Sequence, residues 1–347
     1  MPHMRKRQSR PRWLSGYFCL ALASLGTLEA QQRKILVTGL APEQVAELQA
    51  AAPEARIVPV AAKDMVAQVA DAEAVIGTIT PEAVRAGKRL KWVQVASAGV
   101  ERYLHLASPE LRTSDIVLTN SKIIQGPEIA DHAFALLLAL TRGVAHYRDA
   151  QKQEEWARGG MPLVELKDKT AVVIGVGGIG MQIAVRAKAF GMRVIGVDPE
   201  DFPYVPHVDE WVRPDRLDAV LPRADVVFIA APHTPASELM MGPRQFELLK
   251  KGAYFVAVSR GALFDGDALV RALDSRHLAG AGLDVTNPEP LPKGHPLWKF
   301  NNVVITPHVA GGSDGVGRRR LELYKENLRR FLAGEPLLNV VDKQKGY

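Results

Sequence analysis

The chain has 347 residues, of which 47% are hydrophobic, 24% charged and 6% aromatic, the composition of a globular protein with room for two domains. Its formal net charge is +6. Residues 1–30 carry five basic side chains and one acidic side chain, a net charge of +4, so the rest of the chain carries only +2. We therefore expect no nucleic-acid partner. The single cysteine, Cys19, excludes an internal disulfide framework and a cysteine-rich metal site, and we expect no metal.

Residues 1–30 have the pattern of a secretory signal peptide. A basic segment precedes an uncharged apolar run from Trp13 to Leu25, and small residues follow. The run is too short to cross a bilayer comfortably, so we expect no stable membrane span. The pattern predicts export, for example to a periplasm; the alternative is an N-terminal extension on a cytoplasmic protein.

From Lys34 to Asn120 the sequence alternates between strand and helix patterns. It predicts strands at 35–38, 56–60, 74–78, 92–96 and 116–120, and helices at 42–51, 63–72 and 81–87. Such alternation indicates a parallel, doubly wound sheet, which binds ligands at the carboxyl ends of its strands. Ser97, Ala98 and Gly99 follow one of these ends. We expect their backbone N–H groups to meet a substrate carboxylate, with an ordinary turn as the alternative.

A strongly apolar helix is predicted at 127–141. Its second half is apolar on all sides, which is typical of a helix buried between domains or in a subunit interface. Fifteen residues are too few for a membrane span. We expect a homodimer built on this helix.

The stretch from Thr170 to Asp198 has the order of a dinucleotide-binding βαβ unit. A strand (171–174) runs into Gly175-Val176-Gly177-Gly178-Ile179-Gly180, and a helix (181–190), a second strand (193–197) and Asp198 follow. The first glycine permits a tight turn, the second lets backbone approach a pyrophosphate, and the last lets helix and strand pack closely. Asp198 is expected to bond the ribose hydroxyls of NAD and to repel the 2′-phosphate of NADP. The sequence therefore predicts NAD as the cofactor.

Three chemically useful side chains follow later strands. Strands are predicted at 225–230, 253–258, 279–285 and 303–306, and helices at 245–249, up to Ser275 and at 316–333. Arg260, Glu289 and His308 each follow one of these strands; singly, they could be a surface charge, a loop acid and a buried histidine. Together they fit the reduction of a 2-oxo acid. That reaction needs a cation that binds the carboxylate and polarises the ketone, an acid that protonates the forming alkoxide, and a partner that keeps this acid charged. Arg260, His308 and Glu289 fit these needs in that order.

Several segments resemble the D-isomer-specific 2-hydroxyacid dehydrogenase family. They are Ser97-Ala98-Gly99-Val100, the glycine loop, Arg260-Gly261-Ala262-Leu263, Gly282-Leu283-Asp284-Val285, Pro288-Glu289-Pro290-Leu291-Pro292, His295-Pro296-Leu297-Trp298 and Thr306-Pro307-His308-Val309-Ala310-Gly311. The likeness covers about Lys34 to Val341.

The resemblance implies an α/β fold of two doubly wound parallel-sheet domains, flavodoxin-like and Rossmann, with the active site in the cleft between them. The substrate domain would comprise 33–121 and 313–347, and the NAD domain 122–312. Arg260 and His308 would be catalytic, Glu289 would be the partner of His308, and Asp284 would lie near the nicotinamide carboxamide. Substrate contacts are expected from Ser97, Ala98, Gly99 and Arg260. Cofactor contacts are expected from Gly175, Gly177, Gly178, Ile179, Gly180, Asp198, Pro232, His233, Thr234, Ser259, Asp284 and His308.

The expected activity is an NAD-dependent 2-hydroxyacid dehydrogenase that reduces small 2-oxo acids such as glyoxylate or hydroxypyruvate. Formate dehydrogenases of the family carry glutamine where Glu289 stands, which argues against formate. A phosphite-type dehydrogenase and a non-catalytic, NAD-responsive corepressor remain alternatives. The chain departs from the family in Ala130-Asp131-His132, where glutamate usually precedes the histidine, in Thr286-Asn287, which replaces a more acidic pair, and in its signal-like leader.

Overall fold

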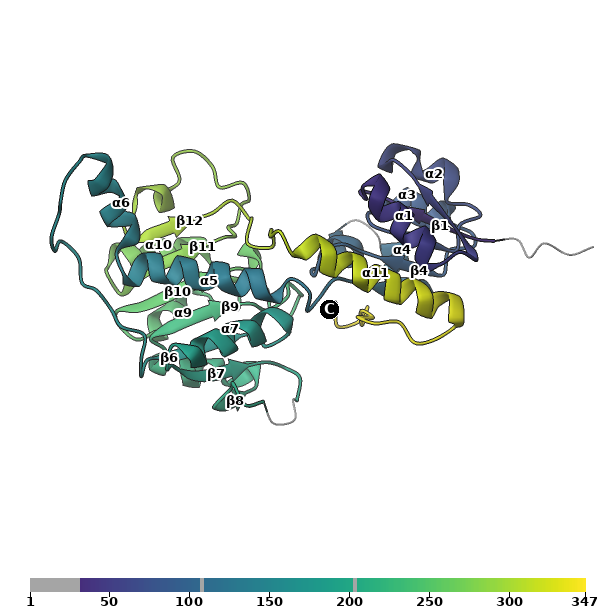
Figure 1. Ribbon diagram of the computed structural model, residues 1–347. Coiled ribbons are helices and arrows are strands. Elements are labelled where there is room, and N and C mark those ends of the chain that lie inside the picture. Colours follow the sequence, from purple (N-terminus) through teal and green to yellow (C-terminus); the bar gives the residue numbers. More distant parts are fainter. Residues whose placement is uncertain (1–31, 107–108, 202–204) are drawn as a thin grey trace, which may run out of the picture. The chain divides into compact units, whose positions relative to one another are not determined.

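The computed structural model describes residues 32–106, 109–201 and 205–347, so the leader predicted at residues 1–30 lies outside the described residues. Residues Arg33–Tyr347 form one compact unit, which contains two parallel sheets. Figure 1 shows helices packed along the strands of both sheets. The predicted class, two parallel-sheet α/β domains, is confirmed.

The first sheet has the strand order β2-β1-β3-β4-β5, with every pair parallel. Its strands are β1 (Arg33–Val37), β2 (Ala55–Pro59), β3 (Ala74–Ile76), β4 (Trp92–Gln94) and β5 (Val117–Thr119). Its helices are α1 (Pro42–Ala51), α2 (Met65–Gln68), α3 (Pro81–Ala86) and α4 (Pro109–Thr113). β3 is buried along its whole length, as its uninterrupted apolar sequence requires.

The second sheet has the order β12-β11-β10-β9-β6-β7-β8 and is also parallel. Its strands are β6 (Thr170–Ile174), β7 (Arg193–Val197), β8 (Glu210–Val212), β9 (Val226–Ile229), β10 (Ala253–Ala257), β11 (Leu278–Leu283) and β12 (Val303–Ile305). Its helices are α5 (Gly126–Thr141), α6 (Val144–Lys152), α7 (Gly178–Ala189), α8 (Leu217–Val220), α9 (Pro243–Leu248) and α10 (Gly266–Asp274). The order reverses between β6 and β9, and doubly wound sheets bind ligands at such a point. The glycine loop follows β6 there.

α5 buries most of its apolar surface within the chain. It packs on α7, β10 and β11. The ring of Phe134 stacks on those of Phe190 and Phe228, with centroids 5.1 and 5.3 Å apart. A Cβ on Gly282 would lie 2.7 Å from Cβ of Leu136, so this glycine lets the helix approach β11 closely. The burial of α5 therefore needs no partner subunit, and the expected homodimer stays a prediction.

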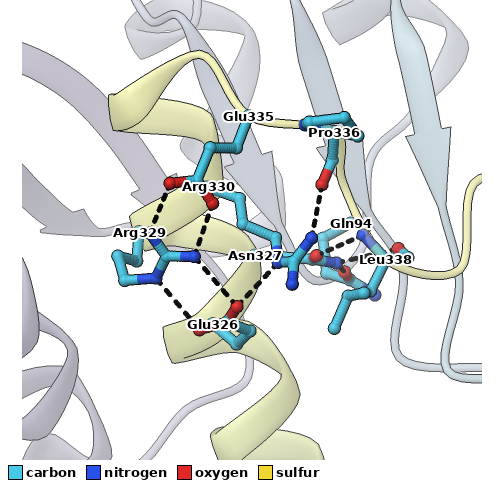
Figure 2. A network of polar contacts seen from close by, with 8 residues as sticks. All are labelled: Gln94, Glu326, Asn327, Arg329, Arg330, Glu335, Pro336 and Leu338. Carbon is cyan, nitrogen blue, oxygen red and sulfur yellow. Dashed lines mark hydrogen bonds and ion pairs between the residues drawn. The ribbon is translucent and has the colours of Figure 1, made fainter.

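The C-terminal helix, α11 (Val316–Ala333), returns to the first sheet. Three of its side chains share a buried cluster with residues of β1 and β3: Leu321, Tyr324 and Leu328. The side-chain amide of buried Asn327 donates to Oε1 of Gln94 in β4 at 2.9 Å and to the carbonyl of Leu338 at 3.1 Å (Figure 2). Its oxygen accepts from the N–H of Leu338 at 2.7 Å. These contacts place α11 against the first sheet, while the division of the chain into two domains at these boundaries stays a prediction.

The structure differs from the prediction at several elements, which include the short helices α4 and α8. The helix expected at 63–72 ends early at Gln68, because the chain turns so that the N–H of Ala72 bonds the carbonyl of Val69 before β3 begins. The short edge strand β8 and the helix α6 were not predicted, and neither contains a fully buried residue. Within the described segments, no helix combines the length and the apolar character that a membrane span requires.

Candidate active site

The glycine loop after β6 is packed on one side and open on the other. Gly175 has a φ of +84°, and a Cβ there would overlap the backbone of Ala231. A Cβ on Gly180 would overlap the carbonyl oxygen of Gly175, so this glycine brings α7 onto β6. A Cβ on Gly177, in contrast, would meet no atom within 4 Å. Since Gly177 precedes the N-terminus of α7, whose N–H groups and dipole attract phosphate, the open side fits a pyrophosphate.

The first turn of α7 contains Gly178 and Ile179. A Cβ on Gly178 would lie 2.5 Å from Cα of Ile123, and a Cβ on Gly126 would lie 2.5 Å from the carbonyl oxygen of Gly178. These close approaches hold the N-terminus of α7 against the start of α5. The predicted cofactor glycines therefore also have a packing role.

Asp198 follows β7 and bonds to the glycine loop. Its Oδ2 accepts from the N–H of Val176 at 2.7 Å, and its Oδ1 accepts from the N–H of Glu200 at 2.9 Å. Each carboxylate oxygen can accept more than one hydrogen bond. The carboxylate is thus held in place and retains the capacity to bind the hydroxyls of a ribose.

Residues beyond α11 contact the same segment. Nζ of Lys345 lies 2.6 Å from Oε1 of Glu200, and the hydroxyl of Tyr347 donates to that oxygen at 2.8 Å. The hydrogen bond from Lys345, reinforced by that from Tyr347, lowers the pKa of Glu200. Burial and then the hydrogen bond to Glu200 raise the pKa of Tyr347, and the charge of Asp198 raises it further. Sequence reasoning missed this contact, because no local pattern connects residues so far apart in the chain.

Polar residues follow β9 and β10 on the same edge of the sheet. Pro232, His233 and Thr234 come after β9, where the hydroxyl of Ser237 donates to the carbonyl of Pro232 at 2.7 Å and accepts from the N–H of Thr234 at 2.9 Å. Ser259 comes after β10 and is 6% exposed, and its hydroxyl has no hydrogen-bond partner among the residues that the structure describes. Buried hydroxyls are normally bonded. This orphaned group and the open side of Gly177 fit a dinucleotide lying along this edge.

Asp284 is 2% exposed and holds the loop that follows β12. Its Oδ1 accepts from the hydroxyl of Thr306 at 2.6 Å and from the N–H of Val309 at 2.9 Å, and its Oδ2 accepts from the N–H of Ala310 at 3.0 Å. The N–H of His308 donates to the carbonyl of Asp284 at 2.9 Å. This buried acid therefore fixes the backbone that carries His308, while its expected contact with the nicotinamide stays a prediction.

His308 and Glu289 form a close pair. Nδ1 of His308 lies 2.6 Å from Oε1 of Glu289. His308 has a φ of +55°, a left-handed conformation that is uncommon outside glycine. Its side chain is 42% exposed and that of Glu289 is 41% exposed, so both are within reach of a small molecule. A carboxylate at this distance fixes the orientation of the ring and leaves Nε2 for proton transfer.

Arg260 lies against the loop that the sequence predicts to bind substrate. Its Nε donates to Oε1 of Glu101 at 2.7 Å, and its Nη1 donates to the carbonyl of Ser259 at 2.7 Å. A Cβ on Gly99 would overlap Nη2 of Arg260, so the guanidinium rests on glycine backbone. The structure thus brings together Arg260 and Gly99, two of the residues expected to hold a substrate carboxylate.

The turn after β4 is held by its carbonyl groups. The hydroxyl of Ser97 donates to the carbonyl of Gly99 at 2.7 Å, and the side-chain amide of Asn120 donates to the carbonyl of Ala98 at 2.7 Å. The N–H of Ser121 donates to the carbonyl of Ser97 at 2.9 Å. These bonds stabilise the turn against which Arg260 lies.

The residues predicted to bind substrate or to take part in the reaction fall into two groups. His308, Glu289 and Asp284 form one, and Arg260 and Gly99 belong to the other. A Cβ on Gly261 would overlap the carbonyl of Thr286, so the segment that carries Arg260 passes directly against the segment that leads to Glu289. Within the part of the chain that the structure describes, no direct bond joins Arg260 to His308.

Sequence reasoning missed two residues near these groups. Glu101 directly follows the Ser97–Val100 turn. An acidic residue next to a turn that is expected to bind an anion is unusual, and this signal could have identified it from the sequence. Nε2 of His132 in α5 lies 2.7 Å from the hydroxyl of Thr306, so it supports the loop that Asp284 holds. Across residues 32–106, 109–201 and 205–347, no group of three or more His, Cys, Asp and Glu side chains could hold a metal ion.

Comparison with known proteins identifies the family. Residues 134–310 match the family described as D-isomer specific 2-hydroxyacid dehydrogenase, NAD binding domain. The glyoxylate reductase of Thermofilum pendens is 31% identical over 82% of this chain and 86% of its own length. The D-3-phosphoglycerate dehydrogenase of Methanocaldococcus jannaschii is 32% identical over 81% of this chain, but the match spans only 53% of that relative.

Solved structures agree with the sequence relatives. A D-isomer specific 2-hydroxyacid dehydrogenase from Xanthobacter autotrophicus, in complex with NADPH and MES, has a TM-score of 0.77 at 28% identity and covers 90% of this chain and 99% of its own. An NADPH-dependent glyoxylate/hydroxypyruvate reductase from Sinorhizobium meliloti, in complex with NADP and sulfate, has a TM-score of 0.78 at 26% identity and covers 91% and 100%. The chain therefore belongs to the D-isomer specific 2-hydroxyacid dehydrogenase family of NAD(P)-dependent oxidoreductases.

Proposed function

We propose that this protein is an NADH-dependent reductase of small 2-oxo acids, with glyoxylate and hydroxypyruvate as the first candidates. The observation that carries the proposal is the pairing of His308 with Glu289 on the sheet edge that also bears the glycine loop. Reductases of these acids among the relatives support the substrate class. The chain spans about half the length of the D-3-phosphoglycerate dehydrogenases that it matches, so the proposed substrates are those of the reductases.

Each residue has one task in the proposed reaction. Arg260 binds the substrate carboxylate and polarises the ketone, using N–H donors that Glu101 and Ser259 do not occupy. His308 donates a proton from Nε2 to the forming alkoxide, and Glu289 holds the ring and stabilises its charged form. The dinucleotide, when bound along the glycine loop, supplies the hydride. In the reverse direction His308 accepts the proton from the 2-hydroxyl.

The preference for NADH rests on charge. Two acids, Asp198 and Glu200, follow β7, and the backbone N–H of Glu200 donates to Oδ1 of Asp198 at 2.9 Å. Acidic groups at this position bind ribose hydroxyls and repel a 2′-phosphate. Lys345 neutralises Glu200 but not Asp198, so a negative charge remains where the phosphate of NADPH would lie.

The test is NADH oxidation by the full chain with glyoxylate, hydroxypyruvate, pyruvate and phenylpyruvate, repeated with NADPH. Turnover of at least one acid, with NADH preferred, is expected. Arg260→Ala and His308→Ala are expected to remove turnover while NADH still binds, as followed by NADH fluorescence. Tight NADH binding without turnover of any acid would instead favour the phosphite-type or the non-catalytic alternative.

We also propose that the chain forms a homodimer. Large apolar side chains lie exposed on one continuous stretch after α5: Val144 (56%), Trp156 (88%) and Leu163 (49%). Large apolar side chains that are exposed in one segment become buried when that segment meets a partner surface. Sedimentation of the full chain tests the proposal, and a monomer at micromolar concentration would refute it. Trp156→Ser, as a dimer-weakening variant, is expected to shift the equilibrium toward monomer.

The charge and hydropathy of residues 1–30 support export. Fractionation of cells that express the full chain with a C-terminal tag tests this, because an exported protein is recovered outside the cytoplasm in a shortened form.

A further inference from the structure

The guanidinium of Arg260 is paired with an acid before any substrate arrives. Its Nε lies 2.7 Å from Oε1 of Glu101, and the side chain of Glu101 is only 15% exposed while that of Arg260 is 28% exposed. The two residues come from segments 159 positions apart. This is a partly buried ion pair at the expected substrate position, and partial burial strengthens its electrostatic effect relative to a surface pair.

The pair uses specific donors of the guanidinium. An arginine side chain has five N–H donors. Glu101 takes the donor on Nε, and the carbonyl of Ser259 takes one on Nη1. Three donors remain, two on Nη2 and one on Nη1, and the edge formed by Nη1 and Nη2 is the one that Glu101 leaves open. A carboxylate can therefore bind side by side only on this edge, because Glu101 blocks the edge that includes Nε.

Glycine at position 99 makes this arrangement possible. A Cβ there would overlap Nη2 of Arg260 and would lie 2.7 Å from Oε2 of Glu101. Any larger residue would push the ion pair away from the Ser97–Val100 turn. The turn and the pair thus form one surface, in which a positive and a negative charge adjoin.

We propose that Glu101 is a positioning and specificity residue, which presents the Nη edge of Arg260 and cancels its charge. This inference deepens the proposed function, since it concerns the same substrate site. A singly charged acid binds the guanidinium edge through its one carboxylate and brings no second negative charge into the site. A doubly charged acid brings a second carboxylate toward Glu101, which repels it. The site should therefore favour monoanionic over dianionic acids.

The experiment compares oxamate and oxalate, which have nearly the same shape but carry one and two negative charges. Their dissociation constants are measured by fluorescence titration of the enzyme–NADH complex. Glu101→Gln keeps an oxygen that can accept from Nε but removes the charge. One unit charge at a distance of about 4 to 8 Å in an aqueous site changes affinity by roughly two- to sixfold. We expect Glu101→Gln to lower the dissociation constant of oxalate, relative to that of oxamate, by that factor.

Two further variants separate charge from position. Glu101→Ala also removes the acceptor that holds Nε of Arg260, so both probes should bind more weakly. The kcat for 2-oxo acid reduction should fall further in this variant than in Glu101→Gln. Glu82→Gln, in the exposed pair of Glu82 with Arg85 on α3, removes the same charge away from the site and should leave both constants unchanged. An oxalate-to-oxamate ratio that stays constant in Glu101→Gln would overturn the inference, as would a failure of both probes to bind.

The same variants distinguish this inference from the proposed function. If no 2-oxo acid oxidises NADH but the oxalate ratio shifts in Glu101→Gln, the proposed reaction is wrong and the role of Glu101 stands. If 2-oxo acids are reduced but the ratio does not shift, the reaction stands and the role of Glu101 is wrong.

Discussion

Oε1 of Glu289 lies 2.6 Å from Nδ1 of His308, although the two residues belong to different loops. Glu289 follows β11 and His308 follows β12, and these strands pair in parallel. Parallel pairing places both loops at the same edge of the sheet. Asp284 then fixes the second loop through bonds to Thr306, Val309 and Ala310. The geometry of the pair is therefore a consequence of the sheet order.

Replacing Glu289 by glutamine should lower kcat about 10- to 100-fold, because the amide can still bond Nδ1 but no longer stabilises the charged ring. NADH affinity should stay the same, since Glu289 contacts the histidine and not the glycine loop. Steady-state kinetics with glyoxylate and NADH fluorescence measure the two effects. Glu247→Gln, an exposed change on α9, is the matched control and should behave as the parent. Normal turnover in Glu289→Gln would show that the pair has no part in proton transfer.

Asp198→Asn should reduce the preference for NADH over NADPH at least tenfold. The amide still occupies the place of the carboxylate, but the negative charge that repels a 2′-phosphate is gone. The ratio of kcat/KM for the two cofactors is the measurement. Asp201→Asn removes a charge three residues away, from a side chain that is 93% exposed and paired with Arg213, and it should leave the ratio unaltered. An equal ratio in Asp198→Asn and the parent would place Asp198 away from the ribose.

Much of the fold follows from the sequence, because buried parallel strands leave a strong signal. The prediction for α11, residues 316–333, matches its observed bounds, since its amphipathic pattern is regular over five turns. Elements whose existence depends on distant partners were missed. β8 is a half-buried edge strand, and Trp211 and its neighbours show no alternation that a local rule would detect.

Local spacing predicts candidate site residues only where one segment carries its own signal, whereas the pairing of Glu289 with His308 was expected from the family resemblance. The glycine loop and Asp198 lie within one βαβ unit, so local spacing was sufficient. The ion pair of Arg260 with Glu101 and the contact of Lys345 with Glu200 join residues that are 159 and 145 positions apart. No periodicity in the sequence encodes such pairs, since they depend on how the segments meet after folding.

Asn327→Ala should lower the free energy of unfolding by about 1–3 kcal/mol, because it removes three hydrogen bonds of a fully buried side chain, one to buried Gln94 and two to the backbone of Leu338. Urea unfolding followed by circular dichroism gives the value. Arg329→Gln is the matched control on the same helix (Figure 2). Arg329 bonds Glu326 and Glu335, and its hydrogen bond lowers the pKa of Glu326 to about 2, yet these groups lie in solvent. Solvent screening leaves such pairs little effect on stability, so the control should unfold at the parent's urea midpoint.

Glu210 should stabilise the edge of the second sheet only above acidic pH. The hydrogen bond from Arg223 lowers the pKa of Glu210 from 4.5 to about 2, with a second contribution from Arg193 in β7. Because the folded pKa is depressed, the carboxylate contributes stability that is fully present above pH 4.5 and is lost as the pH falls toward 2.

Glu210→Gln should therefore destabilise the protein at pH 7 and less at pH 3.5. Since the side chain of Glu210 is 29% exposed and its arginine partners are more exposed, solvent screening limits the difference at pH 7 to about 1 kcal/mol. Urea midpoints of the parent and the variant at pH 7, 5 and 3.5 give the comparison, with Glu247→Gln as the control for an exposed carboxylate on α9. A difference that stayed constant across this range would mean that Glu210 acts through packing and not through its charge.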